Sequence, residues 1–153
     1  MEIQFENRDA FKVFGFKVET NPESDCEDIE KLLENHEKDL LALAKGKSPL
    51  YGIMWDMEKP NYSYLLAIED IDNFTKDNSN KKFKDAISIE IPKGFYAVGK
   101  ISQNTNLIEA WKQLFENDIP NLAYLFDDNH GKYFECYSKN AECTLWVPVK
   151  KTE

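Results

Sequence analysis

The stretch that decides the fold is Lys132–Val149, which reads KYFECYSKNAECTLWVPV. Two runs rich in aromatic and β-branched residues flank the polar pair Lys139-Asn140, a pattern typical of a β-hairpin. If that pair forms a two-residue turn, the register follows, and Cys136 lies opposite Cys143. The sequence therefore predicts a hairpin near the end of the chain.

This register divides the hairpin into two faces, because side chains alternate along a strand. The apolar face carries Phe134, Cys136, Cys143, Leu145 and Val147. The other face carries Tyr133, Glu135, Tyr137, Thr144 and Trp146. One carboxylate among large rings suits a pocket for a flat or cationic ligand. The alternative is an amphipathic hairpin whose aromatic face is merely solvated.

Length and charge limit the classes of function. At 153 residues the chain is long enough for one domain with a substantial core. Its formal net charge of −9 disfavours direct binding to nucleic acid, which requires a basic surface. No apolar run approaches the roughly 20 residues of a membrane span, and no signal peptide is visible. We expect a cytoplasmic protein that does not contact membranes.

The cysteines and histidines give no sign of a metal or cofactor. The three cysteines are an odd number and accompany no secretion signal, which indicates reduced thiols. Cys136 and Cys143 are interpreted as core residues, with a redox pair as the alternative. His36 and His130 are too far apart in the sequence to suggest metal-ligand spacing. We therefore expect no metal site and no cofactor.

Local patterns predict an alternation of strands and helices. Ser24 and Glu27 fit a capping box at the start of a helix that Gly46 ends. Thr105–Asn117 is the second predicted helix, ended by Pro120. The predicted strands are 3–5, 11–18, 50–55, 62–68, 87–91 and 95–101, followed by the hairpin. Asp70–Asp85 is polar and reads as a linker, with a lid as the alternative.

The two halves of the chain resemble each other. Phe11-x-Val13-Phe14-Gly15 matches Phe95-x-Ala97-Val98-Gly99, and each begins the order strand-helix-strand-strand. Such a duplication predicts an α+β fold in which two βαββ units form one curved antiparallel sheet. Both helices would cover one face, leaving a ligand cleft on the other. We expect a single domain over 1–153, with repeats at about 1–70 and 86–150 and a linker at about 70–85.

In its order of motifs, nearly the whole chain resembles the GyrI-like small-molecule-binding domain, the effector-binding domain of AraC- and MerR-type transcription regulators. The matching segments are Tyr51-Gly52-Ile53, Trp55-Asp56, Tyr64, Ile91-Pro92-x-Gly94-x-Tyr96-Ala97-Val98, Trp111, Phe134-Glu135-x-Tyr137 and Trp146-Val147-Pro148-Val149. The chain departs from the family where Asn117-Asp118-Ile119-Pro120 replaces a Trp-Leu-Pro ending. It also leaves no room for a helix-turn-helix before Phe11.

This resemblance implies an aromatic pocket with an acidic residue at its base, matched here by Glu135. The predicted ligand-binding residues are Glu135, Tyr51, Trp55, Tyr64, Trp111, Tyr133, Tyr137 and Trp146. Their ligand would be a hydrophobic, cationic small molecule, and the protein would act as a sensor or sequestering protein without a DNA-binding domain of its own. Two alternatives remain. Glu135 could be the general base of a hydrolase for strained electrophiles, or the acidic surface could bind DNA gyrase or another regulator protein.

Overall fold

The computed structural model describes residues 1–57, 59–74, 81–102, 106–138 and 142–152. It divides the chain into two compact units. Unit 1 consists of Met1–Ala10 and Pro92–Glu153, and unit 2 consists of Phe11–Ile91. Within the described residues, no helix is long and apolar enough to cross a membrane.

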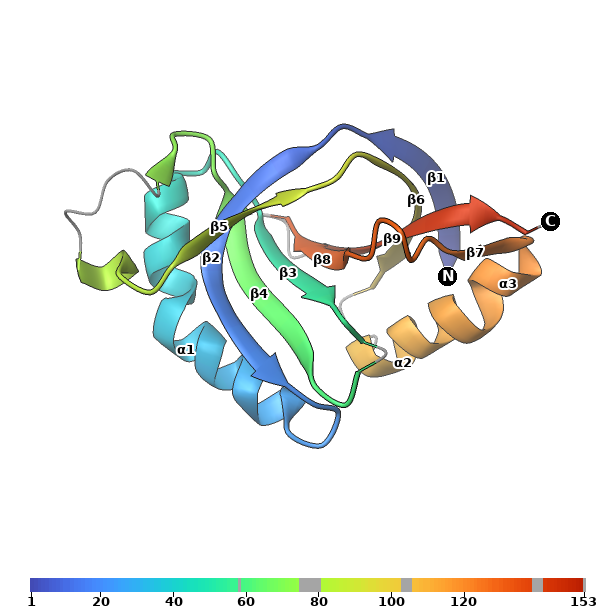
Figure 1. The fold of residues 1–153 in the computed structure, drawn as a ribbon, viewed down its shortest axis with the longest axis horizontal. Coiled ribbons are helices and arrows are strands. Elements are labelled where there is room, and N and C mark those ends of the chain that lie inside the picture. Colours follow the sequence, from blue (N-terminus) through green and yellow to red (C-terminus); the bar gives the residue numbers. More distant parts are fainter. Residues whose placement is uncertain (58, 75–80, 103–105, 139–141, 153) are drawn as a thin grey trace. The chain divides into compact units, whose positions relative to one another are not determined.

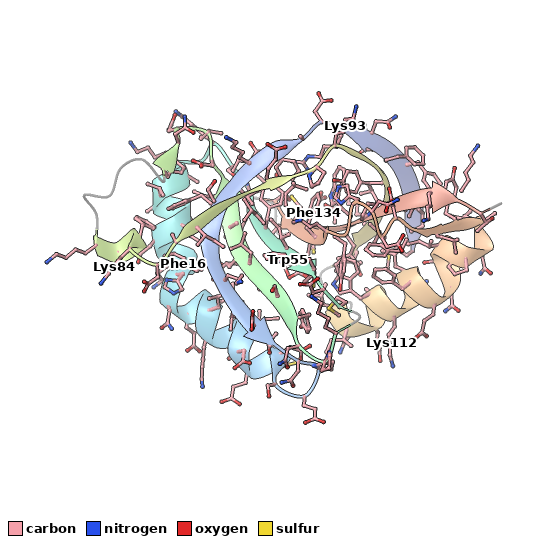
Figure 2. All side chains as sticks on the ribbon, viewed as in Figure 1. Phe16, Trp55, Lys84, Lys93, Lys112 and Phe134 are labelled. Atoms are coloured by element: carbon pink, nitrogen blue, oxygen red, sulfur yellow. The ribbon has the colours of Figure 1, made fainter. Side chains whose placement is uncertain are left out.

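Unit 2 is an antiparallel sheet covered by one long helix. Its elements are β2 (Phe11–Thr20), α1 (Asp25–Ala44), β3 (Leu50–Trp55), β4 (Tyr62–Glu69), η2 (Lys81–Phe83) and β5 (Ile87–Ile91). The strands follow the order β3-β4-β2-β5, and α1 packs along β2 and β4, as Figure 1 shows. Phe16, labelled in Figure 2, stacks on His36 of α1 with 3.6 Å between ring centroids. His36 is thus a packing residue between α1 and the sheet.

Strand register assigns the aromatic residues of unit 2 to opposite faces. Tyr51 pairs with Ala67 and Trp55 with Ser63, so these two rings share one face. Tyr64 lies on the other face together with Tyr62, whose hydroxyl donates to Asp25 of α1 at 2.9 Å. Tyr64 is therefore on the helix side of this sheet, whereas Tyr51 and Trp55 are not. These three predicted ligand-binding residues thus do not share one face of the sheet.

The start of α1 differs from the predicted capping box. Ser24 occupies the N-cap position but makes no side-chain capping bond. Asn21 Oδ1 instead accepts the backbone N–H groups of Glu23 and Ser24, at 3.0 and 3.1 Å. The helix ends at Ala44, followed by Lys45 and Gly46 with positive φ, in agreement with the predicted stop.

Gly15 lets β2 approach β4 closely. A Cβ at this position would lie 1.9 Å from the carbonyl oxygen of Leu66 and 2.7 Å from the Cα of Ala67. Both neighbours are backbone atoms that cannot rotate away. Only glycine fits this crossing, because it carries no Cβ.

Part of the predicted linker carries packed residues. The rings of Phe74 and Phe83 lie 5.6 and 5.9 Å from that of Phe14. Ser88 and the backbone of Phe74 both donate to Asp70. Residues 75–80, the middle of the predicted linker, lie outside the described residues.

Unit 1 likewise consists of antiparallel strands and a helical segment. Its elements are β1 (Glu2–Arg8), β6 (Gly94–Ile101), α2 (Leu107–Gln113), η3 (Leu114–Asp118), α3 (Ile119–Asn121), β7 (Tyr124–Phe126), β8 (Tyr133–Tyr137) and β9 (Cys143–Lys151). The strands follow the order β1-β6-β9-β8, and β7 pairs with the end of β9. Each unit therefore contains strand, helix and further strands in that order, and the predicted α+β class with antiparallel pairing is confirmed.

The second helix does not end before Pro120 as predicted. After α2 the chain forms one π-helical segment, Leu114–Asp118, and continues helically through Pro120 to Asn121. Proline lacks an N–H and clashes with the preceding turn of a regular α-helix. It falls here at the start of α3, directly after the wider π turn, and so stays within the helical segment.

The closing hairpin has a register shifted by one residue from the prediction. Phe134 pairs with Trp146 and Tyr137 with Cys143. The backbone N–H of Ser138 donates to the carbonyl of Glu142 at 3.0 Å, so three residues separate the paired positions rather than two. The predicted turn pair 139–140 itself lies outside the described residues. A one-residue slip moves every side chain of one strand to the opposite face relative to its partner.

Candidate functional site

Glu135 is the centre of a buried cluster within unit 1. It lies in the middle of β8 and is 3% exposed. Its Oε2 accepts a hydrogen bond from the indole Nε1–H of Trp111 at 3.3 Å. Buried carboxylates are uncommon and are normally paired or hydrogen-bonded. The helical segment thus reaches the face of β8 that carries Glu135.

A group of aromatic rings packs together next to this carboxylate. The rings of Trp111 and Phe115 stack at 5.9 Å, and both meet the ring of Tyr133 edge-on, at 5.1 and 5.3 Å. Phe126 of β7 closes the group at 5.9 Å from Tyr133. Edge-to-face rings at these separations are favourable beyond their buried area. Trp111 belongs to this group of rings and also donates its indole N–H to the carboxylate, so the group lies next to Glu135.

Tyr137 and Cys143 form the polar side of the same cluster. The Tyr137 hydroxyl is hydrogen-bonded to both the Glu135 carboxylate and the Cys143 thiol. Burial, followed by the nearby charge of Glu135, raises the pKa of the Tyr137 phenol well above its usual value. The same two causes raise the pKa of the Cys143 thiol to about 12. Both groups therefore stay protonated, with the phenol donating to the carboxylate and its oxygen free to accept from the thiol.

The structure brings together four of the predicted site residues: Glu135, Trp111, Tyr133 and Tyr137. Trp146 does not join them, because it shares its face with Phe134, and those two rings stack at 5.5 Å. The predicted register, which placed Trp146 beside Glu135, was wrong. A three-residue connection gave no sign in the sequence that distinguished it from a two-residue turn.

Three members of the cluster, Phe115, Phe126 and Cys143, were not predicted as site residues. Phe115 follows Trp111 by four positions, a helical spacing that places both on one side of α2 and η3. Cys143 was assigned to the face opposite Glu135, again through the shifted register. It does not pair with Cys136, which lies opposite Thr144. None of Cys26, Cys136 and Cys143 forms a disulfide.

The remaining predicted residues belong to unit 2. The hydroxyl of Tyr51, which is 2% exposed, donates to Glu69 Oε1 at 3.2 Å. Tyr64 is also 2% exposed, and Trp55 is half-buried. The part of these three in ligand binding stays a prediction.

Chemically, the Glu135 cluster offers negative charge and ring faces. Across the described ranges, no group of three or more His, Cys, Asp or Glu side chains is arranged to hold a metal ion. The carboxylate accepts from two uncharged side-chain donors, Trp111 and Tyr137. Both donors are neutral, so an organic cation can add a positive charge beside them.

Comparison with known proteins now assigns the family. A family model described as Cass2, integron-associated effector binding protein, matches residues 4–149. The chain belongs to this family. A search of the curated proteins finds none that matches the chain. Membership in an effector-binding family agrees with the GyrI-like resemblance of the sequence motifs.

Solved structures share the fold of this chain. The integron cassette protein VCH_CASS2 of Vibrio cholerae is 15% identical with a TM-score of 0.72, covering 97% of this chain and 95% of its own. SAV2435, solved bound to tetraphenylphosphonium, is 14% identical with a TM-score of 0.71, covering 98% and 94%. The EcmrR C-terminal domain is 10% identical with a TM-score of 0.60, covering 99% and 98%. At these identities the likeness shows the fold.

Proposed function

We propose that this protein binds hydrophobic organic cations at the Glu135 cluster of unit 1. The observation that carries the proposal is a carboxylate 3% exposed, set among the rings of Trp111, Tyr133 and Tyr137. A cation near a carboxylate in surroundings of reduced polarity gains several times the attraction it would have in water. Ring faces add about 0.5–2 kcal/mol where the cation is desolvated. The tetraphenylphosphonium bound by SAV2435 belongs to this chemical class.

The biological role follows from effector binding. The protein would act as a cytoplasmic sensor or sequestering protein for such cations. The family resemblance implies a regulator protein or DNA gyrase as the macromolecule that could receive the signal. The acidic composition, with a net charge of −9, agrees with both a cationic ligand and a basic partner.

The test compares charge with shape at Glu135. Tetraphenylphosphonium and the neutral triphenylphosphine oxide are titrated calorimetrically into wild type and Glu135→Gln. We expect the variant to lose about tenfold or more in affinity for the cation and to keep its affinity for the neutral compound. Thermal melting establishes that the variant is folded.

Glu116→Gln is the matched control, because Glu116 is an exposed glutamate of the helical segment and its substitution makes the same change of net charge. This control should bind both compounds as wild type does. Equal losses for cation and neutral compound in Glu135→Gln would mean that Glu135 maintains shape rather than recognises charge. If wild type bound neither compound, the small-molecule function would fail and a protein-binding role would take its place.

A further inference from the structure

A second cation-recognition feature lies on the opposite face of β8. The chain has 19 basic residues, of which Arg8 is the one arginine. Its guanidinium carbon lies 5.1 Å from the centroid of the Trp146 ring and 5.5 Å from that of Phe134. Guanidinium is planar, weakly hydrated and stacks on aromatic faces better than the ammonium of lysine. The only arginine thus stands at the position where two ring faces meet a cation.

Contacts with neighbouring residues fix the orientation of the rings that Arg8 contacts. Phe134 and Trp146 lie nearly parallel, at 11°, and Tyr96 meets both edge-on at 5.7 and 5.5 Å. The indole Nε1–H of Trp146 donates to Thr144 Oγ1 at 2.9 Å. The Tyr96 hydroxyl is bonded to His130 Nε2 at 2.8 Å. Phe134, labelled in Figure 2, and Tyr96 are both 0% exposed.

These three rings are separate from the Glu135 cluster. Phe134 and Glu135 are neighbours on β8, so their side chains point to opposite faces of the sheet. Trp146 pairs with Phe134 and shares its face, and Tyr96, which contacts both rings, belongs to the same group. The group is called the Arg8 cage below and consists of Tyr96, Phe134 and Trp146.

We propose that the Arg8 cage is a second site for organic cations, which Arg8 occupies in the resting protein. The matching ligands are guanidinium compounds and other small cations with delocalised charge, because that is the group the rings already hold. Arg8 is tethered to the site, so it competes at an effective concentration of the order of millimolar. A free cation that displaces it releases the last residue of β1, which pairs with Gly94 of β6. Occupancy of the cage would therefore loosen the end of β1.

The test removes the tethered competitor. Methylguanidinium and its neutral analogue N-methylurea are titrated at millimolar concentration into wild type and Arg8→Ala, with the Trp146 indole N–H followed by NMR. We expect methylguanidinium to shift this signal in Arg8→Ala with an affinity about tenfold or more above that for wild type. N-methylurea should leave the signal unchanged in both.

Lys100→Ala is the control for charge. Lys100 is exposed, forms an ion pair with Glu142 at 3.2 Å, and its removal changes net charge as Arg8→Ala does. It should behave as wild type. Equal effects of the two compounds on Arg8→Ala, or an unchanged Trp146 signal with both, would overturn the proposal. If Arg8→Ala is unfolded, methylguanidinium should restore the native spectrum and N-methylurea should not, and failure of that rescue would equally overturn it.

Discussion

The hydrogen bond between Trp111 and Glu135 should contribute measurably to stability. A hydrogen bond to a charged group contributes about 1.5–3 kcal/mol, and the 3.3 Å between Nε1 and Oε2 is long, which favours the lower limit. Trp111→Phe keeps an aromatic ring next to Tyr133 but removes the N–H donor. We therefore expect a coupling free energy of about 1.5 kcal/mol between Trp111→Phe and Glu135→Leu.

Urea unfolding of wild type, both single variants and the double variant measures this coupling directly. In thermal melting, the hydrogen-bond term alone corresponds to a decrease of about 3–6 °C. Trp146→Phe combined with Glu135→Leu is the matched control, since the Trp146 indole donates to Thr144 and not to Glu135. That pair should be additive within about 0.5 kcal/mol. A coupling for Trp111 as small as this control would refute the assigned contact.

Three further predictions concern the rest of the chain. Burial lowers the pKa of His130, so the folded state favours the neutral imidazole and the free energy of unfolding should fall as the pH drops below 6.5. Urea unfolding should show a smaller pH-dependent fall in His130→Gln than in wild type. Gly15→Ala should abolish folding, as measured by circular dichroism, because the added Cβ would clash with backbone atoms of β4. Gly99→Ala should fold, because its Cβ would meet mainly the flexible Met1 side chain. Thiol labelling of the native protein should modify exposed Cys26 first and Cys143 last, and the reverse order would contradict its burial.

The sequence predicted which segments form helices and strands better than it predicted which face of the sheet each side chain occupies. Alternation and helical spacing identified both helices and the strands other than β7, with ends that differ by a few residues. The side-chain content of the hairpin could not select its register, because both possible faces of β8 and β9 carry aromatic residues. Because the observed register differs from the predicted one by one residue, Cys143 rather than Trp146 lies on the same face as Glu135. A pattern with one clearly polar face would have prevented that error.

Part of the candidate site could be predicted from the sequence. A single glutamate within an aromatic strand indicated Glu135, and the resemblance to the GyrI-like family added Trp111, which donates to it. Arg8 was missed, because cation–ring contacts between residues more than a hundred positions apart leave no local pattern. The one sequence feature that could have indicated Arg8 is that it is the single arginine in a chain whose other basic residues are lysines.

The placement of β1 has a consequence for the order of folding during synthesis. β1 precedes β2 in the chain, yet it pairs with β6, and the strand next to β6 is β9. The ribosome therefore releases β1 first, but its partners only after the whole of unit 2 has been made. Such long-range pairing slows folding, and an unpaired strand waiting for its partner is open to misassembly. A tag or truncation that disturbs β1 should consequently impair the folding of unit 1, most of which is synthesised after unit 2.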